Sequence, residues 1–165
     1  MHYILDTGFF IIIRDYYPNA FPAFWEKMDQ AVGSNLISSV KEVKKELEQY
    51  GGKQEHLLKW IKDHEKIFTN PTSEELNKVR QIFEVPEFQN LIDKKKRLGG
   101  GPCADPFVIA KAMKENAVLI SREKPAARNK KGELQGSVKI PDVCKNFNIV
   151  CLSPEKFMEE EGWIF

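Results

Sequence analysis

A single carboxylate interrupts the most apolar stretch near the start of the chain. The run Tyr3-Ile4-Leu5 leads directly into Asp6, and the apolar run Phe9–Ile13 follows after two small residues, Thr7 and Gly8. Residues this apolar are expected to be buried, where a carboxylate is rare unless it is paired or hydrogen-bonded. Asp6 therefore either caps the helix that follows it or lies at the carboxyl end of a strand, where α/β proteins place their active sites.

Apolar patterns along the rest of the chain predict an α/β fold. Short apolar runs predict strands at 3–6, 35–38, 117–121 and 149–152. Helical spacing and helix-start signals predict helices at 8–16, 21–32, from 39, around 57–61, 73–83, 87–96, from 105, 140–147 and from 153, with a strand as the alternative for 8–16. Because the strand at 117–121 directly follows a helix, a strand–helix–strand crossover and a parallel sheet are expected.

Length and composition favour one ordinary globular domain. The 165 residues, 1–165, fit a single domain with a full core. No apolar run is long enough to span a bilayer, and the first residues lack the pattern of a secretory signal. The three cysteines show no CxxC spacing, which argues against a disulfide framework and for a reducing compartment. We therefore expect a cytoplasmic protein without a membrane partner.

Two glutamates share one face of the helix predicted from Ser39. Glu42 and Glu46 are four residues apart, so their side chains lie on the same side of a helix. Ser39 and Glu42 match a capping box, which gives Glu42 a structural explanation. Glu46 lies next to the predicted core residue Leu47 and has no such explanation, so we favour Glu46 as the glutamate that faces a site.

Two further acidic residues occur at element boundaries. Asp105 precedes Pro106, a strong helix start with Asp105 as the cap and Pro106 at the first helical position. Capping explains Asp105 without catalysis, although a capping carboxylate can also face a metal. Glu123 follows Ser121 at the end of the clearest predicted strand. This repeats the order seen at the start of the chain: an apolar strand, a hydroxyl and a carboxylate.

Basic residues gather in two segments. Residues 122–139 lack apolar periodicity and contain six cations, Arg122, Lys124, Arg128, Lys130, Lys131 and Lys139. A long basic loop beside a strand end is either a substrate-contact loop or an ordinary solvated loop. The run Lys94–Arg97, followed by a glycine-rich turn, is either a favourable helix C-terminus or an edge that contacts phosphates.

The placement of the acidic residues predicts a divalent metal site. In an open parallel sheet, Asp6, Glu46, Asp105 and Glu123 are expected to converge at the carboxyl ends of the strands. Two carboxylates about 4 Å apart repel by about 4 kcal/mol at an effective dielectric constant near 20, so a cluster requires protonation or a cation. No His or Cys is expected to converge with them, and oxygen ligands alone favour Mg²⁺ or Mn²⁺. Together with the basic segments, such a site suggests a nuclease more than a small-molecule phosphatase.

The sequence resembles the PIN-domain (PilT N-terminus) nuclease superfamily, which includes VapC-type toxins, and most closely a PIN-like branch known as a domain of unknown function. The resemblance is carried by short motifs spread over nearly the whole chain. They are Tyr3-Ile4-Leu5-Asp6-Thr7, Val43-Lys44-Lys45-Glu46-Leu47, Ala104-Asp105-Pro106-Phe107-Val108-Ile109-Ala110, Val118-Leu119-Ile120-Ser121-Arg122-Glu123 and Lys139-Ile140-Pro141-Asp142-Val143-Cys144.

The resemblance implies a PIN-like α/β domain with a central parallel sheet of about five strands flanked by helices, and with a helical insertion at about 52–96. It implies a Mg²⁺- or Mn²⁺-dependent endoribonuclease with Asp6, Glu46, Asp105 and Glu123 as catalytic and metal-binding residues, supported by the hydroxyls of Thr7 and Ser121. PIN nucleases commonly have Asp where this chain has Glu123, and Asp142 is a candidate substitute ligand. The expected RNA-contacting residues are Arg122, Lys124, Arg128, Lys130 and Lys131. An antitoxin and a second copy of the chain are the expected protein partners.

Three other readings have sequence support. Leu5-Asp6-Thr7-Gly8 matches the aspartic-protease triplet, but those folds are nearly all-β and this chain is mostly helical. A catalytically inactive PIN-like binding module fits the divergent fourth carboxylate. A phosphatase or a flap-type DNA nuclease would share the same metal chemistry.

Overall fold

Five parallel strands form the centre of the molecule. The computed structural model describes residues 1–50, 52, 54–92 and 98–165. The strands are β1 (Tyr3–Leu5), β2 (Ile37–Val40), β3 (Phe68–Thr69), β4 (Val118–Ile120) and β5 (Cys151–Leu152). All neighbouring strands pair in parallel, in the order β3-β2-β1-β4-β5. This confirms the predicted α/β fold with a parallel sheet of about five strands.

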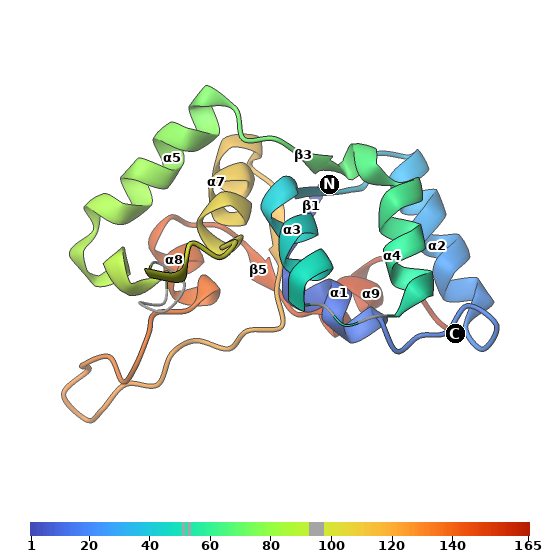
Figure 1. The fold of residues 1–165 in the computed structure, drawn as a ribbon. Coiled ribbons are helices and arrows are strands. Elements are labelled where there is room, and N and C mark those ends of the chain that lie inside the picture. The colour runs from blue at the N-terminus through green and yellow to red at the C-terminus, as the bar shows by residue number, and fades with distance from the viewer. Residues whose placement is uncertain (51, 53, 93–97) are drawn as a thin grey trace.

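Helices flank this sheet (Figure 1). The α-helices are α1 (Thr7–Ile13), α2 (Pro22–Gly33), α3 (Lys41–Tyr50), α4 (Glu55–Asp63), α5 (Ser73–Glu84), α7 (Asp105–Glu115), α8 (Ile140–Asn146) and α9 (Pro154–Glu160), and the 3₁₀ helices are η1 (Glu65–Ile67) and η2 (Pro86–Asn90). The helix α7 packs across β1, β2 and β4 and also against α5. Over the described ranges, no helix has both the length and the apolar character needed to cross a membrane.

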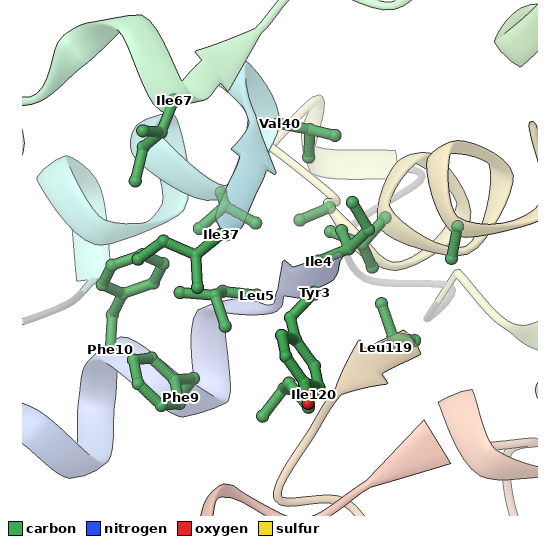
Figure 2. Close-up of a cluster of buried hydrophobic side chains, with 14 of the residues drawn as sticks. Tyr3, Ile4, Leu5, Phe9, Phe10, Ile37, Val40, Ile67, Leu119 and Ile120 are labelled. Carbon is green, nitrogen blue, oxygen red and sulfur yellow. The ribbon is translucent and has the colours of Figure 1, made fainter. Parts of the chain in front are cut away.

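The core explains why the first strand is so apolar. Tyr3, Ile4 and Leu5 are at most 1% exposed, and β1 pairs with β2 on one side and β4 on the other. Figure 2 shows side chains from β1, β2, β4 and α1 meeting in one cluster, in which Phe9 and Phe10 belong to α1. The ring of Phe157 on α9 lies against those of Tyr3 and Phe9. The isoleucine run therefore belongs to a buried helix, and the strand alternative for 8–16 was wrong.

Two predicted helix starts differ from the structure. Ser39 lies within β2 because pairing with β3 continues to Val40, and its hydroxyl donates to the carbonyl oxygen of Leu5 at 2.6 Å. The capping box predicted for Ser39 and Glu42 was therefore wrong. The N-cap residue of α7 is Ala104 rather than Asp105, because the Ala104 carbonyl already accepts from the amides of Phe107 and Val108.

Two other helix predictions were confirmed, one of them only in part. The capping box at the start of α5 is formed, with Thr72 and Glu75 each accepting a backbone N–H from the other residue. Part of the helix predicted at 87–96 is present as η2. Leu91 and Ile92 form a bend rather than a continuation of that helix, and residues 93–97, which include the basic run Lys94–Arg97, lie outside the described residues, as do Gly51 and Lys53.

The basic segment between β4 and α8 forms a projecting hairpin-like turn. Figure 1 shows this segment, in orange, extending away from the body of the molecule. Arg128 and Leu134 form an isolated antiparallel bridge, and the Gln135 amide donates to the Ala127 carbonyl at 2.8 Å. We refer to residues 127–135 as the finger.

Candidate active site

The topology brings the end of β1 between the ends of β2 and β4. Asp6 follows β1, α3 follows β2, and Ser121 follows β4. Since parallel strands end at the same edge of a sheet, residues from three distant parts of the chain meet there. The hydrogen bonds described next join these three parts directly.

Asp6 is the centre of this edge. Its side chain is buried, with 5% of the residue exposed. Oδ1 accepts the backbone N–H of Phe9 at 2.9 Å and so caps α1, and Oδ2 accepts the hydroxyl of Ser121 at 2.7 Å. Asp6 therefore caps α1, lies at the carboxyl end of β1 and links β1 to the residue after β4, while a catalytic role for it stays a prediction.

Burial raises the pKa of the Asp6 carboxyl to about 6. The hydrogen bonds from Ser121 and Phe9 oppose this shift, whereas the charges of Glu123 and Glu46 add to it. These two glutamates are therefore close enough for their charges to act on Asp6. Asp6, Glu46 and Glu123 are thus electrostatically coupled, and we refer to these three residues as the carboxylate cluster.

Glu46, on α3, links the start of α1 to the start of α7 through hydrogen bonds. It is 6% exposed, and its Oε2 accepts the hydroxyl of Thr7 at 2.6 Å. Its Oε1 accepts the backbone N–H of Ala104 at 2.9 Å, which places Asp105 directly beside this contact at the first position of α7. The structure thus places Glu46 at the strand edge through Thr7, the residue after Asp6. Glu42 has one buried oxygen, Oε2, without a hydrogen-bond partner among the described residues.

Glu123 and Asp142 hold the base of the basic loop. Glu123 accepts the N–H of Ile140, the first residue of α8, at 2.8 Å through Oε2, and its own N–H donates to Ser121 Oγ at 3.1 Å. Oδ2 of Asp142 accepts two backbone N–H groups, from Ala126 at 3.0 Å and from Lys139 at 2.8 Å. Asp142 therefore braces both ends of the loop, a role that the sequence pattern did not reveal.

The five predicted RNA-contacting residues are all exposed. Arg122, Lys124, Arg128, Lys130 and Lys131 are the five. Arg128 pairs with Glu87 of η2 and donates to the Gly132 carbonyl at 3.0 Å. Lys130 and Lys131 lie at the turn of the finger.

Arg122 lies beside the carboxylate cluster because of Gly8. A Cβ atom built on Gly8 would lie 2.8 Å from Cγ of Arg122 and 3.2 Å from Oδ1 of Asp6. A side chain at position 8 would therefore collide with Arg122, so Gly8, which the sequence motifs did not single out, allows Arg122 to pack beside Asp6. The signal was present in the sequence, as a glycine two residues after the strand-end carboxylate.

Two cysteines also approach the cluster, which the sequence did not predict. The neighbouring Cys151 thiol, burial and the charge of Asp6 raise the pKa of Cys144. The cysteines described are all free thiols. The charge of Asp6 therefore acts on these thiols, which α8 and β5 carry, but within the described part of the chain they do not join the carboxylates in a group that could hold a metal ion.

The carboxylate cluster offers the type of ligand atom that a hard cation prefers. Asp6, Glu46 and Glu123 supply only oxygen atoms, the ligands preferred by Mg²⁺ and Mn²⁺, and the pKa of Asp6 is raised mainly by burial, with smaller contributions from the charges of Glu123 and Glu46. Over the described ranges, however, no three His, Cys, Asp or Glu side chains are arranged closely enough to hold a metal ion. The carboxylates instead bond to backbone N–H groups and hydroxyls.

Comparisons with known proteins agree with this fold. The sequence model of the family described as "Domain of unknown function (DUF4411)" matches residues 3–165. No curated protein matches the sequence. The chain is similar to a chain in the crystal structure of VapBC2 from Rickettsia felis bound to a DNA fragment from their promoter, with a TM-score of 0.53 and 16% identity. This similarity covers 93% of this chain and 98% of that chain, and it shows a common fold.

Replacing Asp6 with Asn is expected to stabilise the metal-free protein at neutral pH. The unfolded carboxyl ionises near pH 3.9, whereas the folded one ionises near pH 6. As the pH rises between these values, only the unfolded state releases its proton, so the free energy of unfolding falls. Above pH 6 this penalty is on the order of 3 kcal/mol.

Urea unfolding in a chelator at pH 4 to 8 measures this difference, because the other titrating groups are common to both proteins. Asp6→Asn is expected to be the more stable protein at pH 8, and its advantage should disappear near pH 4. If Asp6→Asn is less stable than the unaltered protein at pH 8, or if the difference in stability does not change with pH, the pKa of Asp6 is not raised by folding.

Proposed function

The chain belongs to the DUF4411 family, and we propose that it is a metal-dependent nuclease that hydrolyses phosphodiester bonds in RNA. The observation that carries this proposal is the buried carboxyl of Asp6, whose pKa is raised to about 6 beside Glu46 and Glu123. Such groups cluster at functional sites more often than elsewhere. The resemblance to PIN nucleases supports the choice of reaction.

Asp6 and Glu123, with Glu46 and Asp105, are the residues that would hold Mg²⁺ or Mn²⁺. The bound ion would polarise the scissile phosphate and lower the pKa of a water molecule for attack. Ser121 and Thr7 are positioning residues, since their hydroxyls hold Asp6 and Glu46 in place. The Ala104 N–H holds the other oxygen of Glu46, so the glutamate side chain is fixed before substrate arrives.

The charges around the cluster suit a polyanionic substrate. Arg122 lies next to Asp6, where a guanidinium would meet the phosphate nearest the cleaved bond. Lys124 continues the same exposed segment, and Lys130 and Lys131 lie on the finger. Cations at increasing distance from the cluster would bind successive phosphates of one strand.

The proposed nuclease activity predicts metal-dependent cleavage that requires Glu46 but not Glu42, two glutamates on the same helix. With Mn²⁺ or Mg²⁺, the protein should cleave RNA, and Asp6→Asn should lower the rate by about 100-fold or more, as removal of a charge-stabilising group does in other enzymes. Glu46→Gln should also lower the rate, because Glu46 contacts Thr7 and Ala104. Glu42→Gln, on the same face one turn earlier, should leave the rate close to that of the unaltered protein.

Cleavage is measured on labelled RNA and DNA, with circular dichroism to verify folding. Cleavage that persists in excess chelator would reject a metal mechanism. The alternative is a catalytically inactive binding module, favoured by the absence of three suitably arranged ligands among the described side chains. No cleavage of RNA or DNA, together with no measurable binding of Mn²⁺, would establish that alternative, and cleavage of branched DNA alone would indicate a flap-type nuclease.

The second prediction concerns the finger. In chelator, the double variant Lys130→Ala, Lys131→Ala should bind single-stranded RNA more weakly than the unaltered protein. The slope of log affinity against log salt should become shallower by roughly 0.7 for each phosphate that is no longer neutralised. The exposed pair Lys27→Ala, Lys114→Ala, on α2 and α7, is the matched control. Equal slopes for both double variants would show that the finger is only a solvated loop.

The third prediction concerns a toxin role, which rests on the resemblance to VapC-type toxins and on the shared fold with a chain of VapBC2. An antitoxin protein would then be the partner, and a second copy of the chain would be a further one. Induced expression should arrest bacterial growth, and Asp105→Ala should relieve the arrest. Normal growth during expression of an enzyme that is active in vitro would exclude the toxin role while leaving the nuclease proposal intact.

A further inference from the structure

An open cavity of about 700 Å³ lies away from the carboxylate cluster. It is lined by Tyr17, Pro18, Asn19, Gln54, Glu55 and His56. A second cavity of about 230 Å³ shares Pro18 and His56 with it and is also lined by Trp25 and Trp60. Figure 1 shows the segment between α1 and α2 passing close to the start of α4, and these two parts of the chain form the cavity walls.

Polar atoms at this cavity lack partners. Oε1 of Gln54 and Nε2 of His56, two residues that line the cavity, are buried atoms with no hydrogen-bond partner among the described residues. Gln54 precedes α4, but its side chain makes no capping bond. Buried polar groups are satisfied in most native proteins, so two such atoms on residues of one cavity wall point to a ligand. The pair contains an acceptor and an imidazole nitrogen that can serve as donor or acceptor.

Aromatic rings form the apolar part of the cavity. Tyr17 is 55% exposed, and its ring lies 5.1 Å from that of His56. The His56 ring in turn lies 5.7 Å from Trp25. An exposed tyrosine beside a histidine offers a planar ligand a surface for stacking, which is how proteins bind unpaired bases.

The charges argue against a phosphate and for a neutral, planar group. Among the described residues, Glu55 is the one formally charged member of the lining of the larger cavity, and the positive charge of Arg14 is met by Asp15 at 3.8 Å. A phosphate would therefore be repelled rather than attracted. The acceptors Gln54 Oε1 and the Glu55 carboxylate instead match the amino group of adenine or cytosine, since Gln and Glu accept hydrogen bonds from such groups.

The helices α1 and α3 connect this cavity to the carboxylate cluster. They pack side by side, joined near one end by the bond from Thr7 to Glu46. At the other end, a Cβ atom on Gly52 would lie 3.8 Å from Nη1 of Arg14 and 2.5 Å from Oε1 of Gln54. The seven residues of α1 span about 10 Å, a distance that a single strand covers in a few nucleotides.

We propose that this cavity binds one unpaired, amino-bearing base of the RNA, stacked on Tyr17 and hydrogen-bonded to Gln54, while the strand continues along α1 to Asp6. This inference rests on the proposed ribonuclease function and adds a preference for single-stranded adenine or cytosine over uracil. The phosphates would be bound on the Arg122 side and the base on the Tyr17 side.

The test measures binding of fluorescein-labelled oligo(A), oligo(C) and oligo(U) of eight nucleotides by anisotropy, in chelator so that no cleavage occurs. The unaltered protein should bind oligo(A) and oligo(C) more tightly than oligo(U). Tyr17→Ala should weaken binding of oligo(A) by about fivefold or more, the usual effect of removing one stacking ring. Gln54→Leu, which keeps the size but removes the acceptor, should bring the oligo(A) to oligo(U) affinity ratio close to one.

Leu76→Ala is the control, since Leu76 is 45% exposed on α5 and does not line the cavity. If RNA is bound and cleaved but Tyr17→Ala and Gln54→Leu bind oligo(A) like the control, the base site is wrong and the proposed function stands. If the unaltered protein neither binds nor cleaves any RNA, both fail. If both variants keep the RNA affinities of the unaltered protein but lose binding to the antitoxin, the cavity binds protein rather than RNA, and the inference is overturned.

Discussion

The removal of the Asp6 carboxylate from water is the constraint on which this site depends. Two hydrogen bonds, from the Phe9 amide and the Ser121 hydroxyl, hold the carboxylate in place, yet burial still raises its pKa to about 6. The same bonds start α1 and join β1 to β4. The contacts that fix the start of α1 and join β1 to β4 thus also hold Asp6 where the charges of Glu46 and Glu123 act on it.

Much of the fold was predictable because it depends on local signals. The apolar strands β1 and β4 and the Thr72 capping box follow from patterns only a few residues long. The strand β3 was missed because two residues carry no period, and it is defined by its pairing with β2. Ser39 was misassigned for the same reason, because sheet pairing overrode a valid local capping signal.

The candidate site was predictable in its residue types and less so in its contacts. A carboxylate after β1 and another after β4 could be read from the sequence, and topology then brought Asp6 and Glu123 close enough for their charges to interact. The contact between Glu46 and Ala104, the approach of the cysteines and the packing of Arg122 over Gly8 join residues far apart in sequence. Such contacts depend on how α3, α7 and α8 pack, for which a single sequence contains no local signal.

The brace at Asp142 has an evolutionary consequence. One carboxylate oxygen closes the loop at Ala126 and Lys139. Within the loop Val138 is buried and Leu134 packs against the core, whereas residues 127–133 are exposed. Doubling the length of a flexible loop costs only about 0.6 kcal/mol in closure entropy. Insertions and substitutions at this exposed tip can therefore accumulate in diverging lineages with little loss of stability. The brace thereby separates a tip that tolerates change from the part of the fold that must remain unchanged.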